Sequence, residues 1–175
     1  MSETPAFGTG LSTAELRSEL QEGSTPDLDR RRKIIQLSLA GIASMAAVTL
    51  LQTGVVKHLP DPPLDSFDSD KVNSSETAYA LGTPDGTLSL AGLALNIPIA
   101  AFGGAARFER QPAVPLLAAG KAMLEAAAAG WYFYQMPAKE KSWCAYCIAG
   151  AAINFSIFAL TVPEAIKAFR KLTER

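Results

Sequence analysis

The sequence predicts an all-α integral membrane protein, a four-helix bundle with a short amphipathic lid helix in the outer loop. The first observation is a set of four apolar stretches at residues 34–56, 87–106, 112–136 and 142–162. Each approaches or exceeds the roughly 20 apolar residues that a helix needs to cross a bilayer core about 30 Å thick. A soluble bundle would need polar outer faces with helical periodicity, whereas these stretches are apolar all round.

The second observation is that the basic residues gather on one side of the predicted bundle. If the N-terminus is cytoplasmic, eleven Lys and Arg residues fall inside and four fall outside. The four outer ones are Lys57, Lys71, Lys139 and Lys141. An excess of Lys and Arg in cytoplasmic loops sets the orientation of a membrane protein. We therefore expect a multi-pass protein of the cell membrane with both termini in the cytoplasm.

The two ends of the chain are expected to be cytoplasmic tails, at residues 1–32 and 168–175. The first tail is rich in small, polar and acidic residues and is expected to be disordered. One short helix is predicted within it at about residues 13–21, where Ser12 or Thr13 can cap the helix and Glu15 begins its first turn. The apolar stretch that follows is too long for a signal peptide, so we expect an uncleaved span.

A long outer loop, residues 57–86, joins the first two spans. Three prolines within residues 60–63 stop the first helix, because proline lacks the backbone N–H that a helix interior uses. Farther along, apolar and small residues recur at roughly helical spacing within residues 72–81. This pattern predicts a short amphipathic helix over the mouth of the bundle, with Gly82 as its C-cap.

Cys144 and Cys147 are the only cysteines in the chain, and they lie at the start of the fourth apolar stretch. The unpaired N–H groups and the dipole of a helix N-terminus favour negative charge, so Cys144 is placed to react as a thiolate. Cys147 lies one turn deeper on the same face, where it can close a disulfide or touch a ligand within the bundle. The predicted topology puts both on the outer, periplasmic side, where conditions are oxidising.

Two other interpretations of the cysteine pair compete with redox function. The pair could be two small buried hydrophobic residues, but its position at a helix start favours chemistry. A structural zinc site needs four ligands, and the chain adds only His58, its sole histidine, to the two thiols. We therefore predict no metal site. With a net charge of −1 and no basic surface, we also predict no nucleic-acid partner.

Two motifs carry a resemblance to a known family. One is the run Trp-Cys-Ala-Tyr-Cys at residues 143–147, which enters the last span. The other is Ser-Asp-Lys-Val-Asn-Ser-Ser at residues 69–75 of the loop. With four spans and a long first loop, the chain resembles the vitamin K epoxide reductase family over roughly residues 33–167. In that family's lid helix, a cysteine precedes an Asp-Lys-Val run and a serine pair. The resemblance implies a membrane oxidoreductase that couples thiol–disulfide exchange to a quinone held within the bundle.

The resemblance also implies a role for each cysteine. Cys147 corresponds to the thiol that faces the quinone, and Cys144 to the thiol that exchanges with a donor. The family's two loop cysteines, which normally pass electrons to the outer cysteine, are replaced here by Asp61 and Ser69. The expected donor is therefore a separate thioredoxin-like protein. The alternative is a non-catalytic membrane scaffold, or a subunit of a membrane complex, derived from the same fold.

The residues that would contact the quinone are less clearly marked. The family tends to place a tyrosine one turn beyond the second cysteine, and this chain has Ala151 there. Asn96, Tyr146 and Asn154 remain as candidates for polar contacts within the bundle.

Lys121 and Glu125 are the charged residues of the third apolar stretch. They are four residues apart and therefore share one helix face. Ionisable groups inside a membrane are costly and mark either a mutual pair or a function. One interpretation is an ion pair that faces the bundle interior, with Lys121 reaching toward the cytoplasm. The other is a proton path to a reduced quinone, which must take up two protons.

Overall fold

The computed structural model describes residues 4–174, and the secondary structure of this part is almost entirely helical. The helices, in chain order, are α1 (Thr13–Glu22), α2 (Pro26–Gln52), α3 (Ser69–Asn73), a 3₁₀ helix (Glu76–Tyr79), α4 (Asp85–Ala101), α5 (Arg107–Arg110), α6 (Ala113–Gln135), a π-helical turn (Met136–Glu140) and α7 (Ala145–Thr173). Within the described part of the chain, extended pairing is limited to two isolated bridges. The predicted all-α membrane fold is confirmed.

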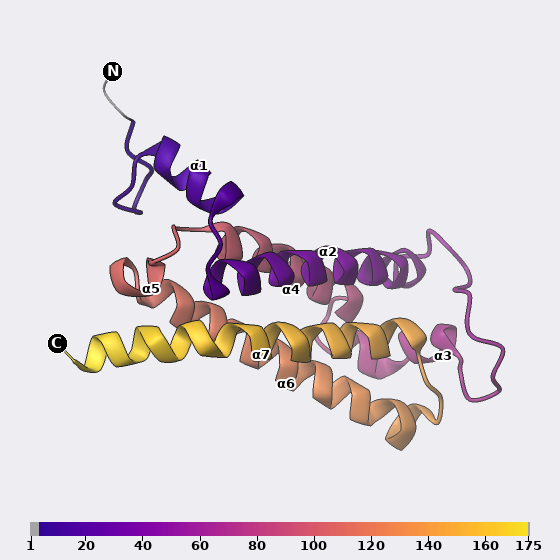
Figure 1. Ribbon diagram of the computed structural model, residues 1–175. Coiled ribbons are helices and arrows are strands. Elements are labelled where there is room, and N and C mark those ends of the chain that lie inside the picture. The colour runs from indigo at the N-terminus through magenta and orange to yellow at the C-terminus, as the bar shows by residue number, and fades with distance from the viewer. Residues whose placement is uncertain (1–3, 175) are drawn as a thin grey trace.

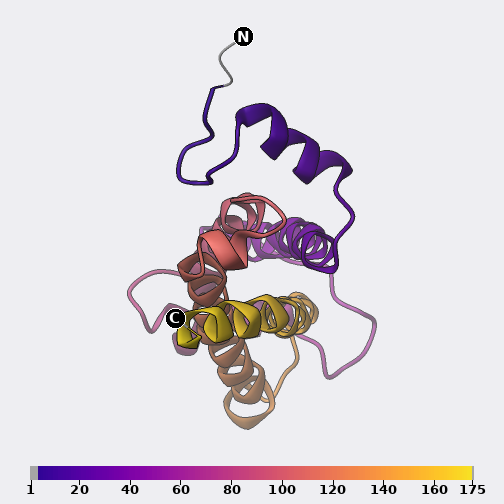
Figure 2. The ribbon, with the colours of Figure 1, turned by 60° about the vertical axis from the view of Figure 1, so that its left-hand side comes forward.

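Four long helices, α2, α4, α6 and α7, form the bundle (Figure 1). Helix α2 packs against α4 and α7, and α6 packs against α7, whereas α4 and α6 touch each other much less. Figure 1 places both termini and α5 at one end of the bundle, called the terminal end below, and α3 at the opposite end, called the cysteine end. In the turned view of Figure 2, α1 lies outside the bundle.

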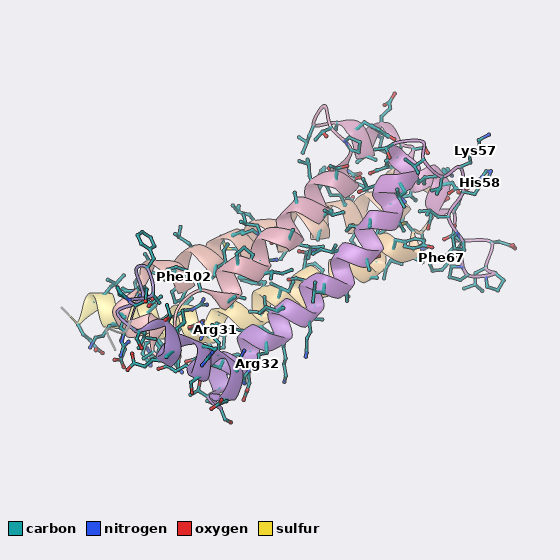
Figure 3. The ribbon with its side chains drawn as sticks, turned by 90° about the horizontal axis from the view of Figure 1, so that it is seen from above. Arg31, Arg32, Lys57, His58, Phe67 and Phe102 are labelled. Atoms are coloured by element: carbon teal, nitrogen blue, oxygen red, sulfur yellow. A yellow bond between two sulfur atoms is a disulfide. The ribbon has the colours of Figure 1, made fainter. Side chains whose placement is uncertain are left out.

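The lengths of the four helices suit a membrane. Helices α2, α6 with its π-helical continuation, and α7 are long and apolar enough to cross a bilayer. Helix α4 is apolar but has 17 residues, which gives about 26 Å at 1.5 Å per residue. Polar side chains gather at both ends: Figure 3 shows Arg31 and Arg32 at the terminal end, and Lys57 and His58 at the cysteine end.

Helix α4 ends at Ala101, five residues before the predicted boundary, because two buried arginines bind the backbone that follows it. Gly103 has a φ of 76°, which turns the chain out of the helix. Arg31 donates to the carbonyls of Phe102 at 3.1 Å and of Gly104 at 3.0 Å. Arg107 also donates to the Phe102 carbonyl, at 3.0 Å. Within the last turn of α4, Arg107 donates to the Ile99 carbonyl at 2.6 Å, so a side chain satisfies one of the carbonyls that the helix end leaves free.

The N-terminal segment contains the predicted short helix. Ser12 caps α1 in a capping box with Glu15, and the hydrogen bonds from Ser12 hold the pKa of the Glu15 carboxyl below its ordinary value. The rest of the segment is predicted from the sequence to be disordered. The structure describes it from residue 4 onward, and the Glu19 carboxylate of α1 accepts a hydrogen bond of 2.6 Å from the Ala105 N–H.

The outer loop contains two short helical pieces in place of the single lid helix that the spacing suggested. Helix α3 ends at Asn73, and the 3₁₀ helix begins at Glu76 after a break at the serine pair. Val72 and Ala78 are buried, one in each piece, so both pieces turn an apolar side inward. Gly82, with a φ of 76°, follows the second piece as predicted.

Candidate functional site

The two cysteines form a disulfide across the first turn of α7, with their Cα atoms 5.2 Å apart. Cys144 is the N-cap residue of α7, and its sulfur accepts a hydrogen bond of 3.1 Å from the Cys147 backbone N–H. This is one of the N–H groups that a helix start leaves without a backbone partner. After reduction, a thiolate at Cys144 would gain both this hydrogen bond and the positive end of the helix dipole.

The outer loop and the π-helical turn after α6 together bury Cys144. The residue is 0% exposed and packs in a cluster with Val72 and Met136. Two backbone hydrogen bonds fix the loop to the residue before it, from Asp68 N–H to the Trp143 carbonyl at 2.9 Å and from Trp143 N–H to the Ser66 carbonyl at 2.8 Å. Residues 66–73, together with Met136, therefore seal Cys144 from solvent in this conformation.

Asn73, at the end of α3, contacts both sulfur atoms. Its side-chain nitrogen donates to the Ser69 carbonyl at 2.7 Å and to the Cys144 sulfur at 3.2 Å, and its oxygen lies 3.5 Å from the Cys147 sulfur. A carbonyl can only accept, so the Ser69 bond fixes which way the amide points. The asparagine is 2% exposed. It places a donor on Cys144 and an acceptor beside Cys147.

A cavity of about 320 Å³ lies in the bundle beside the pair, within the range of small-molecule sites. Cys147 lines it, whereas Cys144 does not. Its walls are mostly apolar and come from α2, α4, α6, α7 and the two helical pieces of the outer loop. The apolar side chains include Met45, Val48, Leu88, Leu124, Phe133 and Met136. Polar groups at its surface include Asn73, Tyr132 and Asn154. The cavity can thus hold an apolar ring system next to one sulfur of the disulfide.

The polar residues singled out from the sequence lie in three different places. Asn154 lines the cavity, with its amide donating to the Gly150 carbonyl at 2.9 Å. The Tyr146 hydroxyl points to the loop, where it donates to the Pro60 carbonyl at 3.0 Å. Asn96 lies deeper, against Lys121 and Glu125. Only Asn154 of these three borders the same cavity as Cys147.

Two cavity residues, Asn73 and Tyr132, were not singled out as site residues from the sequence. Asn73 lies within the loop motif that carries the family resemblance, and that motif is the sequence feature from which its place at the site could have been inferred. Tyr132 lies among aromatic residues near the end of α6, where an interfacial belt is expected. Its place on the cavity wall depends on how α6 is rotated against α4 and α7, which helical spacing alone does not give.

The loop positions that replace the family's cysteines lie in contact. The Asp61 carboxylate accepts hydrogen bonds from the Ser69 N–H at 2.7 Å and from the Ser69 hydroxyl at 2.6 Å. Ser69 is 0% exposed. A noncovalent contact therefore joins the two positions at which the family pattern has a redox-active pair.

A membrane-suited helical bundle with a disulfide at one helix start and an apolar cavity beside it defines a class: membrane proteins built for thiol–disulfide chemistry next to a lipid-soluble molecule. The model of the vitamin K epoxide reductase family matches residues 33–162, well over half of the chain, and the chain belongs to that family. Membership supports a quinone-related membrane oxidoreductase in general. No curated protein matches the chain.

Proposed function

We propose that this protein oxidises the thiols of a separate thioredoxin-like protein and passes the electrons to a quinone through the Cys144–Cys147 pair. The observation that carries the proposal is the position of Cys147, which is bonded to Cys144 and lines an apolar cavity of about 320 Å³. A quinone ring in that cavity would meet the sulfur directly, and the protein would supply position and a dry site while the quinone supplies the redox chemistry.

The reaction has two halves. In the first, a partner thiolate attacks the Cys144 sulfur, the Cys144–Cys147 bond breaks, and a second partner thiol resolves the mixed disulfide. The partner leaves with a disulfide, and Cys144 and Cys147 are left reduced. In the second, the Cys144–Cys147 bond forms again, and the two electrons released reduce the quinone, which takes up two protons to become a quinol. The sum is partner dithiol plus quinone giving partner disulfide plus quinol.

Asn73 and the start of α7 support different roles for the two thiols. The Asn73 amide and the Cys147 N–H both donate to the Cys144 sulfur, and they would stabilise its thiolate. Asn154, on the cavity wall, uses one N–H of its amide on the Gly150 carbonyl and has a second N–H that can donate to a quinone carbonyl. Tyr146 and Asn96 point elsewhere, so we assign them no quinone contact.

We further propose that the protein lies in the cell membrane with the terminal end in the cytoplasm and the cysteine end outside. The uneven distribution of Lys and Arg supports this orientation. It puts the disulfide on the oxidising side, where a secreted thioredoxin-like protein can reach the loop.

The test is quinone-dependent thiol oxidation in membranes that carry the full-length protein. Variants C144A and C147A should each lose the activity, because neither can form the disulfide. The matched control is S156A, which alters an exposed serine on the same helix and should retain activity. Unchanged turnover in either cysteine variant would reject the proposal.

Two observations favour a second function, a non-catalytic scaffold. Cys144 is fully buried, and Asp61 and Ser69 stand where a relay needs cysteines. Trapping free thiols in living cells and counting them by mass spectrometry separates the two functions. A pair that shifts between oxidised and reduced forms when the quinone pool is altered supports the enzyme. A pair that stays bridged whatever the state of the pool supports the scaffold.

A further inference from the structure

The ion pair inside α6 borders the same cavity as the redox-active cysteine. Glu125 lines the cavity together with Cys147. Its carboxylate lies 2.6 Å from the Lys121 ammonium and accepts a second hydrogen bond, of 3.4 Å, from the Asn96 amide. The two charged side chains are about one-fifth exposed, at 20% and 21%. A carboxylate is therefore held at the wall of the proposed quinone site, well inside the apolar part of the bundle.

The surroundings of Lys121 hold its ammonium in place. Besides Glu125, it donates to the Gly92 carbonyl and to the Asn96 side-chain oxygen, both at 2.8 Å. Gly92 itself lies against the Glu125 carboxylate, so that a Cβ at this position would overlap the carboxylate. Helix α4 thus approaches the pair closely through a glycine, and three acceptors surround the cation.

Polar groups continue from this pair toward the terminal end. Asn96 also borders a second cavity of about 10 Å³, which has room for about one water molecule. Glu164 also lines that small cavity and is bound to Arg107 by two hydrogen bonds, of 2.8 and 2.7 Å. Carboxyl, amide and ammonium groups therefore form a series between the terminal end and the large cavity.

We infer that Glu125 is the acid that protonates the quinone as it is reduced, an inference that rests on the proposed function. When the Cys144–Cys147 bond forms, two electrons pass to the quinone, whose oxygens then need two protons. Glu125 rests as a carboxylate paired with Lys121. It takes up a proton that arrives by way of the small cavity and Asn96, gives it to the nearer quinone oxygen, and returns to the paired carboxylate. The second proton comes from the Cys147 thiol, because Cys144 reacts as a thiolate whose proton has already left.

The other titratable groups on the cavity wall have different surroundings. Asp85 on α4 accepts from the Gln52 amide at 2.6 Å, and Glu140 accepts from the Thr77 hydroxyl at 3.0 Å. Both lie toward the cysteine end, at the start of α4 and after α6. Tyr132 is also a titratable residue of the cavity wall, but it is a phenol and not a carboxyl group. Glu125 alone among these carboxyl groups has an ammonium beside it, so it is the one whose anion is already compensated.

The test compares E125Q with K121M/E125Q in purified full-length protein reconstituted in vesicles. The assay supplies dithiothreitol and a short-chain ubiquinone, and the C144A/C147A variant gives the background rate. E125Q retains the shape of the side chain but has no acidic proton. Its kcat should fall by about 100-fold, the usual scale of general acid catalysis, with the KM for quinone changed less than about twofold. E125D, which retains the acid, should recover part of the rate.

The double variant separates acid catalysis from charge balance. K121M/E125Q removes both charges, so a purely structural ion pair predicts that its kcat returns to the wild-type value. Acid catalysis predicts that it stays as low as that of E125Q, and it also serves as the test if E125Q does not fold. The charge control is D29N, which removes an exposed ion pair with Arg32 and should leave kcat unchanged.

The outcomes distinguish failure of the role of Glu125 from failure of the proposed function. A kcat for E125Q within about twofold of wild type, or full recovery in K121M/E125Q, overturns the role of Glu125 and leaves the proposed function standing. Wild-type protein that reduces no more quinone than C144A/C147A overturns both.

Discussion

Asn73 should set the reduction potential of the cysteine pair, and N73A measures its contribution. The substitution removes the donor that lies 3.2 Å from the Cys144 sulfur and also the bond to the Ser69 carbonyl. A hydrogen bond to a charged group contributes about 1.5–3 kcal/mol. The bond is strong in the reduced state, where Cys144 is a thiolate, and weak in the disulfide, because a neutral sulfur is a poor acceptor. Its loss therefore destabilises the reduced form.

For a two-electron couple, about 1.4 kcal/mol corresponds to about 30 mV, so N73A should make the potential more negative by about 30–60 mV. The assay equilibrates the protein with a series of glutathione buffers, traps free thiols with a maleimide and measures the bridged fraction. N154A is the matched control, because it removes an amide from the same cavity wall whose donor bonds to the Gly150 carbonyl instead of to sulfur. Its potential should stay at the wild-type value.

A reduction potential for N73A within about 10 mV of wild type would refute the reasoning, since it would mean that the Asn73 amide stabilises the reduced and oxidised forms equally. A shift of equal size in N154A would also refute it, by showing that loss of packing in the cavity moves the potential. N73D provides a check on sign. It replaces the donor with a carboxylate beside the thiolate, so it should lower the potential further than N73A does.

Two other predictions concern the loop and the terminal end. In the wild type, the side chains of Asp61 and Ser69 hydrogen-bond at 2.6 Å, so the two cysteines of D61C/S69C should be able to form a disulfide. The variant should oxidise small dithiols faster than wild type, because the loop then carries its own relay. An unchanged rate would show that the absence of loop cysteines does not limit thiol exchange. E164Q breaks the buried ion pair with Arg107. Leaving that guanidinium uncompensated should destabilise the protein by about 3–5 kcal/mol, measured as a lower thermal unfolding temperature in detergent. A change of less than about 1 kcal/mol would contradict a buried ion pair at this position.

The sequence located the helices because a bilayer requires a minimum length of apolar helix and because caps are local. It did not give every boundary: α2 begins at Pro26, within the predicted tail, and α7 continues to Thr173, beyond the predicted end at residue 162. Ser12 with Glu15 marks the start of α1, and the N-cap position of Cys144 follows from the start of the last apolar stretch. The boundary of α4 was less accessible. It depends on Arg31 and Arg107, which reach the chain after the helix from other parts of the fold, and such contacts leave no periodic signal in α4 itself.

The candidate site also has some features that the sequence predicts and others that depend on tertiary packing. The cysteine pair could be found from spacing, and Lys121 with Glu125 from their charge in an apolar stretch. That Glu125 borders the cavity of Cys147, whereas Tyr146 does not, depends on helix rotation and on the loop. Helical spacing fixes neighbours on one helix, but it does not fix which face meets which helix.

The seal over Cys144 yields a last prediction, because a partner protein can exchange with this cysteine only when the loop opens. In the C147A variant, Cys144 is the only thiol, and its reaction with an impermeant maleimide then reports opening of residues 66–73. D61A removes both hydrogen bonds to Ser69. A loss of about 1–2 kcal/mol should raise the open fraction, and with it the labelling rate, about 5- to 30-fold.

The control for this measurement is D65A, in an exposed part of the same loop, which should label at the rate of the unmodified loop. Applied to intact cells, the same reagent also reports the side of the membrane, since an impermeant maleimide reaches only thiols that face outward. Rapid labelling of Cys144 before the loop is loosened would mean that the loop does not gate exchange. Labelling only after the membrane is broken would place the cysteine end in the cytoplasm, where a secreted thioredoxin-like partner cannot reach it.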